Sequence, residues 1–468
     1  MSRLDRSDIQ GILLHGYGRM RGASFLLAEI QDPDACRSWL ARAAGRVTDA
    51  SGPQEERCFN LAFTHAGLAR LGVAERLSGL SREFVEGMTA PHRQRILGDH
   101  PGTPSDPRLW AWGGTEERAQ PVHLLLMLYA LTPSAAARDG ERVAAELADH
   151  GMRVSATLDS NPLKDGKEHF GFRDGISNPR LTLDPAELAS QHAVMAGEFV
   201  LGYPNQARVL PQSPRLGSER GESDWGRNGS YLVFRQLSQD VELFWETMQA
   251  SSRQLGRNAT HDDAKWVASK MVGRWPNGRP LTASPDSDEG ELRDLNDFAF
   301  HESDADGQRC PLGAHIRRTN PRDSLRPGPK GSLEFVKSHR ILRRGRTYGS
   351  PVASAARPPA AATASEFPDR GSTDERGLLF LCFNTDLRGQ FEFMQQTWMN
   401  NEKFQDAYRA VDPVAGVHSR RRSITSTNFI VPDTPLRRRV TDIPSFVSVR
   451  GGAYFFLPGL AALRALSG

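Results

Sequence analysis

The chain has 468 residues, of which 38% are hydrophobic and 25% are charged, and its formal net charge at pH 7 is +3. This composition fits a soluble globular protein with a real core and excludes a chain that is disordered throughout. The small net charge gives no electrostatic reason to expect nucleic acid or a membrane as the main partner, although arginine clusters occur at 420–422 and 437–439.

The cysteines and the N-terminus further limit the kinds of protein that this sequence is expected to encode. Cys36, Cys58, Cys310 and Cys382 are widely separated and form no CxxC pair, so neither a zinc site nor a disulfide framework is expected. The first residues carry charges and glycines where a signal peptide needs an apolar stretch, and no twin arginine precedes one. No uninterrupted apolar run reaches 18 residues. We therefore expect a cytoplasmic protein without a membrane span.

The first third of the chain alternates between strand-like and helix-like segments. In chain order we predict strands at 23–30, 58–64 and 122–131 and helices at 34–44, 65–71, 83–88 and 134–150. The run at 122–131 is apolar throughout and has strand length, which is typical of a central strand that is buried on both faces.

A similar succession returns later in the chain. We predict strands at 230–237, 378–384 and 446–457 and helices at 241–255 and 391–399. Two α+β halves, each a sheet with helices, would account for both series. Long segments with turn composition, at 211–229, 276–297 and 351–373, separate the elements, and the last is rich in alanine and proline and is expected to be flexible.

Three segments carry residues that could perform chemistry. The first is a turn-rich stretch, Gly171-Phe-Arg-Asp-Gly-Ile-Ser-Asn-Pro179, in which Asp174 is bracketed by glycines. The second runs from Cys310 through His315 to Arg322, and the third is 339–349, which contains Arg343. Taken singly, each has an ordinary explanation: a turn aspartate, a core histidine and a solvated arginine cluster.

Taken together, the three segments resemble the dye-decolorizing peroxidase family. The GxxDG signature is intact at 171–175, His315 begins a HIRR-x-NPR run, and Arg343 lies in an ILRRG segment. The resemblance continues through segments at 230–235, 377–383, 390–398 and 449–457, so it spans most of the chain.

This resemblance implies a fold and a cofactor. The fold would be α+β, with two ferredoxin-like halves of the dimeric α+β barrel type, at 1–195 with the GxxDG loop near its end and at 196–468 with most of the haem site. The cofactor would be haem b, with His315 as the axial ligand of the iron. Asp174 would transfer the proton of hydrogen peroxide, and Arg343 would favour the ionised aspartate and stabilise developing negative charge.

The surroundings of these residues are less certain from sequence. An axial histidine needs a hydrogen-bond acceptor on its other ring nitrogen, and Asp412 is our candidate, with Glu402 and Asp442 as alternatives. Arg317 and Arg318 are candidates for pairing with haem propionates, because a guanidinium matches a carboxylate bidentately. Residues 378–383 are expected to line the pocket, but whether 379, 381 and 383 or the other set faces the haem stays open.

The function that the resemblance implies is a haem peroxidase that reduces hydrogen peroxide and oxidises bulky aromatic or phenolic compounds. The alternative is a haem-binding or haem-handling protein without peroxidase turnover, which would have no need of a paired aspartate and arginine. The natural reductant and the oligomeric state cannot be read from the sequence.

Overall fold

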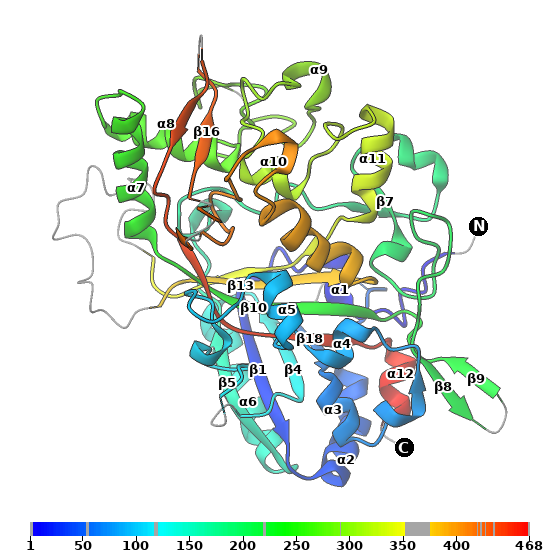
Figure 1. Cartoon of the computed structure of the whole chain (residues 1–468). Coiled ribbons are helices and arrows are strands. Elements are labelled where there is room, and N and C mark those ends of the chain that lie inside the picture. The colour runs from blue at the N-terminus through cyan, green and yellow to red at the C-terminus, as the bar shows by residue number, and fades with distance from the viewer. Residues whose placement is uncertain are drawn as a thin grey trace.

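The computed structural model describes residues 3–52, 56–116, 120–218, 221–290, 292–351, 375–418, 420–421, 424–425, 427–433 and 436–466. It has an α+β fold in which strands of both halves of the chain join one nine-stranded antiparallel sheet. The path of this sheet is open, from β11 at one edge to β5 at the other, so it forms no closed barrel. In Figure 1 the helices α2, α3 and α6 of the first half lie at the bottom and α7, α8, α10 and α11 of the second half lie at the top.

The first half has the order strand, helix, strand, strand, helix, strand. These elements are β1 (Gly22–Ile30), α2 (Pro33–Ala43), β2 (Arg57–Phe63), β4 (Leu124–Ala130), α6 (Pro133–Ala148) and β5 (Met152–Asp159). They lie in the sheet in the order β2-β4-β1-β5, and all neighbours are antiparallel. This is the ferredoxin-like arrangement that was predicted.

The second half repeats the same strand order with longer insertions. Its elements are β10 (Ser230–Gln239), α7 (Val241–Gln254), β11 (Leu342–Arg343), β12 (Arg346–Tyr348), β13 (Gly377–Asn384), two wide π-helical turns (Arg388–Glu392 and Met394–Met399) and β18 (Val447–Leu457). The order β11-β13-β10-β18 matches that of the first half. The predicted fold class is therefore confirmed, whereas the predicted boundary between residues 195 and 196 stays a prediction.

The two halves meet edge to edge and are joined by packing more than by strand pairing. Strand β18 pairs with β10 along its length but contacts β2 at a single registered pair, Phe456 with Phe63. A buried cluster of residues from β1, β2, β4, β10, β13 and β18 lies between the halves, where the rings of Phe25 and Phe234 are 5.3 Å apart.

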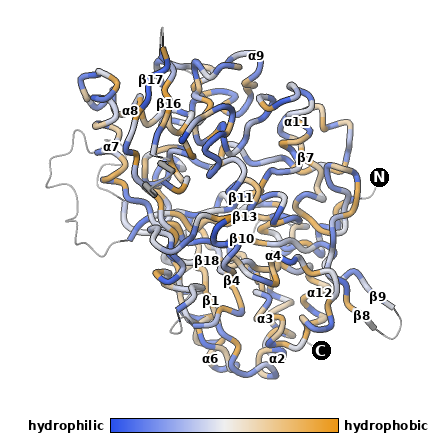
Figure 2. The backbone as a smooth tube through the Cα atoms, in the orientation of Figure 1, coloured by the Kyte–Doolittle hydropathy of each residue, from blue (hydrophilic) through white to orange (hydrophobic). Residues whose placement is uncertain are grey.

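Alternation of side chains along the strands divides this core from a second one under the helices. On β10, Leu232 and Phe234 belong to the cluster between the halves, whereas Tyr231 and Val233 face the helix-covered side. The helices that cover the sheet have an apolar stripe, and Figure 2 shows hydrophobic residues, in orange, alternating with hydrophilic ones along them.

The longer helices begin where a side chain can accept the first free backbone N–H groups. Thr132 caps α6 with proline in the first helical position, and Asp240 caps α7. Helix α8 (His261–Val272) begins with a reciprocal capping box between Thr260 and Asp263. Helices α7 and α8 pack on each other through a separate apolar cluster that includes Phe244, a neighbour of the functional loop described below.

Shorter elements complete the described residues. The helices are α1 (Gly11–His15), α3 (His65–Arg70), α4 (Arg82–Glu86), α5 (Pro91–Leu97), α9 (His301–Asp304), α10 (His315–Thr319), α11 (Pro329–Ser338) and α12 (Leu460–Ala465). The strands are β3 (Leu77–Ser78), β6 (Arg180–Thr182), β7 (Ala193–Met195), β8 (Arg215–Ser218), β9 (Gly221–Asp224), β14 (Arg420–Arg421), β15 (Ile424–Thr425), β16 (Phe429–Val431) and β17 (Arg438–Val440).

Most predicted elements are found, and the misses have local reasons. All six predicted strands correspond to strands of the large sheet. Strand β5 was missed although its sequence, MRVSATLD, alternates apolar and polar residues; as an edge strand it has no continuous apolar run of the kind that marks β4. Helix α8 was missed, and the segment at 211–229, predicted as a loop, contains the hairpin β8–β9. The predicted flexible segment at 351–373 lies outside the described residues apart from Pro351.

Membrane insertion was also tested on the described part of the chain. None of the helices there combines the length and the apolar composition that crossing a bilayer requires.

Candidate functional site

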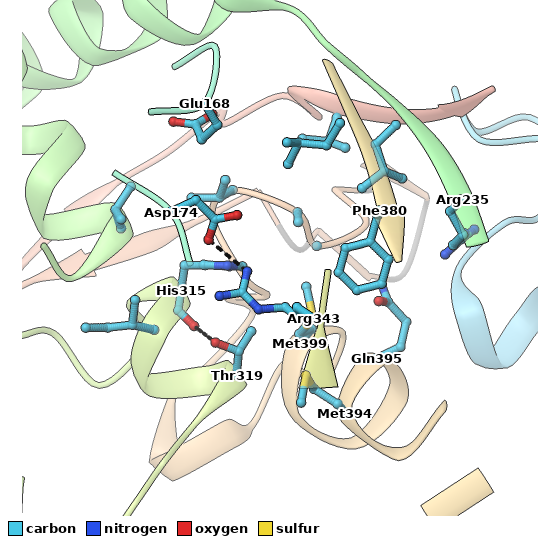
Figure 3. A pocket seen from close by; sticks show the side chains of 18 of the residues that line it. Glu168, Asp174, Arg235, His315, Thr319, Arg343, Phe380, Met394, Gln395 and Met399 are labelled. Carbon is cyan, nitrogen blue, oxygen red and sulfur yellow. Dashed lines mark hydrogen bonds and ion pairs between the residues drawn. The ribbon is translucent and has the colours of Figure 1, made fainter. Parts of the chain in front are cut away.

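A large cavity lies above the second half of the sheet. Its volume is about 1960 Å³ with the open mouth included. The walls come from the GxxDG loop, α10, β11, β13, the π-helical turns and the start of β18, and residues 97–99 and 103–105 of the first half also line the cavity. Asp174, His315 and Arg343 all line this cavity, as Figure 3 shows.

The loop that carries Asp174 is a tight turn that depends on its glycines. Gly171 and Gly175 have φ values of +94° and +79°, which side chains other than glycine rarely adopt. The backbone N–H of Asp174 donates to the carbonyl of Gly166 at 3.0 Å and closes the turn. The glycine bracket therefore aims a carboxylate out of a loop and into the cavity.

Asp174 and Arg343 form an ion pair. Nη1 of Arg343 donates to Oδ1 of Asp174 at 2.9 Å. Burial by itself raises the pKa of Asp174, but the Arg343 guanidinium, the N–H of Gly175 and the more distant His315 outweigh it, so the pKa of this carboxyl lies below its usual value. The aspartate is therefore ionised at neutral pH.

Strand alternation separates Arg343 from its neighbour Arg344. Arg343 pairs with Cys382 in β13, and its backbone N–H donates to the side chain of Asn178, which follows the GxxDG motif. Arg344 points away from the cavity and donates to the carbonyls of Ile12 and Leu13. Only Arg343 of the two lines the cavity, as expected for successive residues of a strand.

His315 is the first residue of the short helix α10. Its Nδ1–H donates to Oδ2 of Asp412 at 2.9 Å, and Asp412 is fully buried. Oδ1 of Asp412 accepts the backbone N–H groups of Val414 and Ala415, both at 2.9 Å. The expected partner Asp412 is thus confirmed over Glu402 and Asp442.

This contact determines the state of the imidazole. Burial lowers the pKa of His315 and the Asp412 carboxylate raises it, with the net shift upward; burial raises the pKa of Asp412, and His315 more than compensates. With a proton held on Nδ1, the lone pair of Nε2 is left for another ligand.

Arg317 and Arg318 do not line the cavity, which corrects the expectation that they hold propionates. Both are fully buried. Arg317 donates to Asp304 and to the carbonyls of Ala305 and Cys310. Arg318 donates from all three of its guanidinium nitrogens to backbone carbonyls, those of residues 313, 398, 401 and 410. Their N–H groups are used within the protein, where they bind the segments behind His315 together.

Three other arginines take the place of this pair on the cavity wall. Arg274, Arg322 and Arg340 line the cavity and are at most 6% exposed. Within the described residues their hydrogen bonds go to neutral groups, and none of the three forms an ion pair. Burial lowers the pKa of Arg274 and Arg340 to about 10 and holds that of Arg322 well below its usual value, and each is also repelled by at least one other of the cavity arginines.

Such a set of buried cations is suited to an anionic group that enters the cavity, since carboxylates would supply the missing counter-charge. Sequence reasoning chose the wrong arginines of the HIRR-x-NPR run. Helical periodicity accounts for Thr319, which lies four positions after His315 on the same face and lines the cavity, but not for Arg322, which lies beyond the end of α10.

Strand β13 contributes alternate side chains to the apolar wall of the cavity. Leu378 and Phe380 face the cavity, whereas Leu379, Leu381 and Phe383 belong to the core between the two halves. Further apolar residues on the wall come from the π-helical turns, namely Phe391, Met394 and Met399.

Comparison with known proteins agrees with this geometry. The model of the Dyp-type peroxidase C-terminal region matches residues 165–417. Peroxidase 2 of Mycetinis scorodonius is 29% identical over 98% of this chain and 87% of its own length. The crystal structure of a decolorizing peroxidase from Auricularia auricula-judae covers 99% of this chain and 100% of its own, with a TM-score of 0.77 and 26% identity.

A structure of a dye-decolorizing peroxidase in complex with 2,6-dimethoxyphenol covers 100% of both chains, with a TM-score of 0.77 and 25% identity. The family model spans more than half of the sequence and includes Asp174, His315, Arg343 and Asp412. The chain therefore belongs to the Dyp-type peroxidase family and is an oxidoreductase of the dye-decolorizing type.

Proposed function

We propose that this protein binds haem b through His315 and uses Asp174 and Arg343 to reduce hydrogen peroxide while it oxidises aromatic or phenolic compounds. The observation that carries the proposal is that one cavity holds both the ion pair of Asp174 with Arg343 and His315, whose Nδ1–H donates to Asp412. The dimethoxyphenol complex of a related structure supports phenols as one substrate class.

The residues of the cavity fit haem in three respects. Nε2 of His315 makes no hydrogen bond to the described residues and is available to iron. The walls contributed by β13 and the π-helical turns are apolar, as a porphyrin requires. Arg274, Arg322 and Arg340 supply buried positive charge for the propionates. When bound, haem would supply the redox-active iron at which peroxide is reduced.

Asp412 would act on this site through His315. As a buried acceptor for Nδ1–H, it holds the ring in one orientation and one tautomer and makes the imidazole a stronger electron donor. Its own hydrogen bonds to backbone N–H groups keep it in place.

Asp174 would carry the proton. Its carboxylate takes a proton from one oxygen of hydrogen peroxide and returns it to the other oxygen, which leaves as water. Because Arg343 binds Oδ1, Oδ2 is the oxygen better placed to receive the proton. Arg343 keeps the carboxylate ionised between turnovers and stabilises the negative charge that develops as the O–O bond breaks.

The alternative function, haem binding without turnover, differs in what it requires of Asp174. A haem carrier needs the His315 side of the cavity alone, whereas the ion pair between Asp174 and Arg343 has a use only if protons are transferred there. This pair favours peroxidase turnover.

The test compares spectra and peroxide kinetics of variants. His315→Ala should lose the Soret band of bound haem, and a variant with an unchanged band would refute the ligand assignment. Asp174→Asn should retain haem and slow the reaction with peroxide in stopped-flow mixing by about 10² to 10⁴-fold, the usual contribution of a proton-transfer group. An unchanged rate would exclude Asp174 as the proton carrier.

A further inference from the structure

We propose that Glu168 is a positioning residue for Asp174: its carboxylate fastens the turn of the GxxDG loop to the central sheet and so fixes the place of the catalytic aspartate. The proposal rests on the function proposed above for Asp174. It goes beyond that function because it assigns a role to a partly buried carboxyl group on the cavity wall that the peroxide chemistry does not use.

Glu168 ties together the residues that lead to Asp174. Its Oε2 accepts the N–H of Phe170 and its Oε1 accepts the N–H of Phe172, both at 2.9 Å. Its own backbone N–H donates to the carbonyl of Phe172 at 2.9 Å, and its carbonyl accepts the N–H of Gly171 at 2.8 Å. Four hydrogen bonds from one residue thus close the turn at 168–172, two residues before the aspartate.

The same carboxylate attaches this turn to the sheet. Nε2 of Gln239, the last residue of β10, donates to Oε2 of Glu168 at 2.6 Å. Gln239 is buried and pairs with Val447 of β18, so its backbone is held in the ladder between two long strands. The loop between β5 and β6 is also bonded to the short strands β11 and β12, and the bond from Gln239 is the one that joins it to β10.

Two further contacts hold the turn but do not replace Glu168. The ring of Phe170 stacks on Phe244 of α7 with centroids 4.3 Å apart. The ring of His169 bonds through Nε2 to the carbonyl of Tyr348 in β12 at 2.8 Å. These contacts fix the first part of the turn, and the bond from the N–H of Phe172 to Glu168 fixes the part that leads into Asp174, whose own N–H donates to Gly166.

A carboxylate suits this position better than its amide. Glu168 accepts three N–H groups on two oxygens, and among the described residues it forms no ion pair. An amide has one acceptor oxygen, so Glu168→Gln would set an NH₂ group against at least one N–H donor of the turn. Figure 3 places Glu168 and Asp174 on the same side of the cavity, opposite Phe380.

The charged groups around Glu168 and Asp174 determine how the pH dependence of the reaction rate would change. Asp174 is faced by Arg343 of β11, His315 of α10 and Arg274 after α8, and by Glu168 as the nearby anion. Burial raises the pKa of Glu168 to about 7, with Asp174 adding to the rise, and lowers the pKa of His169 to about 4. Because Glu168 takes up its proton at a higher pH than Asp174 does, loss of the Glu168 charge alone would leave the pKa of Asp174 unchanged, whereas movement of Asp174 away from Arg343 would raise it.

The experiment measures two reactions of the holoenzyme over pH, for wild type and Glu168→Gln. One is the rate constant with hydrogen peroxide. The other is the association rate of cyanide, which binds after hydrogen cyanide gives its proton to a base in the cavity and requires no turnover. The matched control is Asp184→Asn, because Asp184 also accepts a loop N–H, that of Ala186, but lies outside the cavity lining.

We expect Glu168→Gln to keep the Soret band and to slow both reactions by about 10²-fold, the cost of an ångström-scale displacement of a catalytic group. The acid limb of both profiles should move to higher pH, because Asp174 loses its contact with Arg343. Asp184→Asn should leave rates and limbs unchanged.

Other results would overturn the proposal. An acid limb that stays in place means that Glu168 does not hold Asp174 beside Arg343, and unchanged rates mean that it does not position Asp174 at all. If Glu168→Gln fails to fold, Gln239→Met, which removes one of the three bonds, should shift the limb upward by a smaller amount, and no shift refutes the inference. If Asp174→Asn itself reacts at the wild-type rate, it is the proposed function that fails.

Discussion

The role of Arg318 gives the sharpest quantitative test, because sequence and structure assign it different tasks. We consider Arg318→Met, which keeps most of the apolar stem and removes the guanidinium. In the structure this group donates to the carbonyls of residues 313, 398, 401 and 410 at 2.6 to 3.2 Å and lies over the ring of Phe404. A propionate ligand would instead have N–H groups free toward the cavity.

The loss of stability follows from these four bonds. A hydrogen bond to a charged group contributes about 1.5–3 kcal/mol, so four amount to roughly 6–12 kcal/mol. The burial of the cation opposes this by several kcal/mol, and the same desolvation lowers the pKa of Arg318 to about 10. We expect Arg318→Met to lower the free energy of unfolding by about 3–5 kcal/mol, the usual cost of breaking a buried charged network.

Urea unfolding of the haem-free protein, followed by tryptophan fluorescence, measures this loss without a contribution from cofactor binding. Arg388→Met, at an exposed position of the first π-helical turn, is the control and should change stability by less than about 0.5 kcal/mol. Arg322→Met should weaken haem binding. If Arg318→Met leaves unfolding unchanged and weakens haem binding instead, our reasoning about the two arginines is wrong.

Two predictions concern the ion pairs of the cavity. Arg343→Leu removes the main group that opposes the effect of burial on Asp174, so the pKa of the carboxyl should rise. Since the carboxylate exists above that pKa, the peroxide rate should begin to fall at higher pH than in wild type, and a stopped-flow pH profile with an unmoved acid limb would contradict this. Asp412→Asn removes the anion behind His315 and should weaken haem affinity by about 10–100-fold in a spectroscopic titration, whereas unchanged affinity would exclude the positioning role of Asp412.

The parts of the fold that could be predicted are those whose apolar pattern lies within a single segment of the sequence. Strands β1, β4 and β13 are marked by continuous buried runs, and the repeated succession of elements indicated two similar halves. Strand β5 lies at the edge of the sheet with mixed burial and therefore has no such pattern. Neither the pairing of β18 with β2 nor the side of β13 that faces the cavity is encoded within a single segment.

The site was predictable in its principal residues and not in its surroundings. Family motifs identified Asp174, His315 and Arg343, and the structure brings them to one cavity from segments far apart in the chain. Arg318 and Arg322 look alike in sequence, and the phase and the early end of helix α10 decide which one reaches the cavity. Such orientation depends on tertiary packing, which residue types alone do not determine.

The wall of the cavity draws on both halves of the chain. Residues 97–99 and 103–105 belong to the first half, whereas Asp174 lies in the loop before β6, and His315 and Arg343 belong to segments of the second half. Asp99 forms a buried ion pair with Arg235 of β10, and the side chain of Ser105 accepts the N–H of Val449 in β18, so side chains of this segment bind it to the second half. A change in how the two halves pack would therefore reshape the cavity while Asp174 and Arg343 stay as they are.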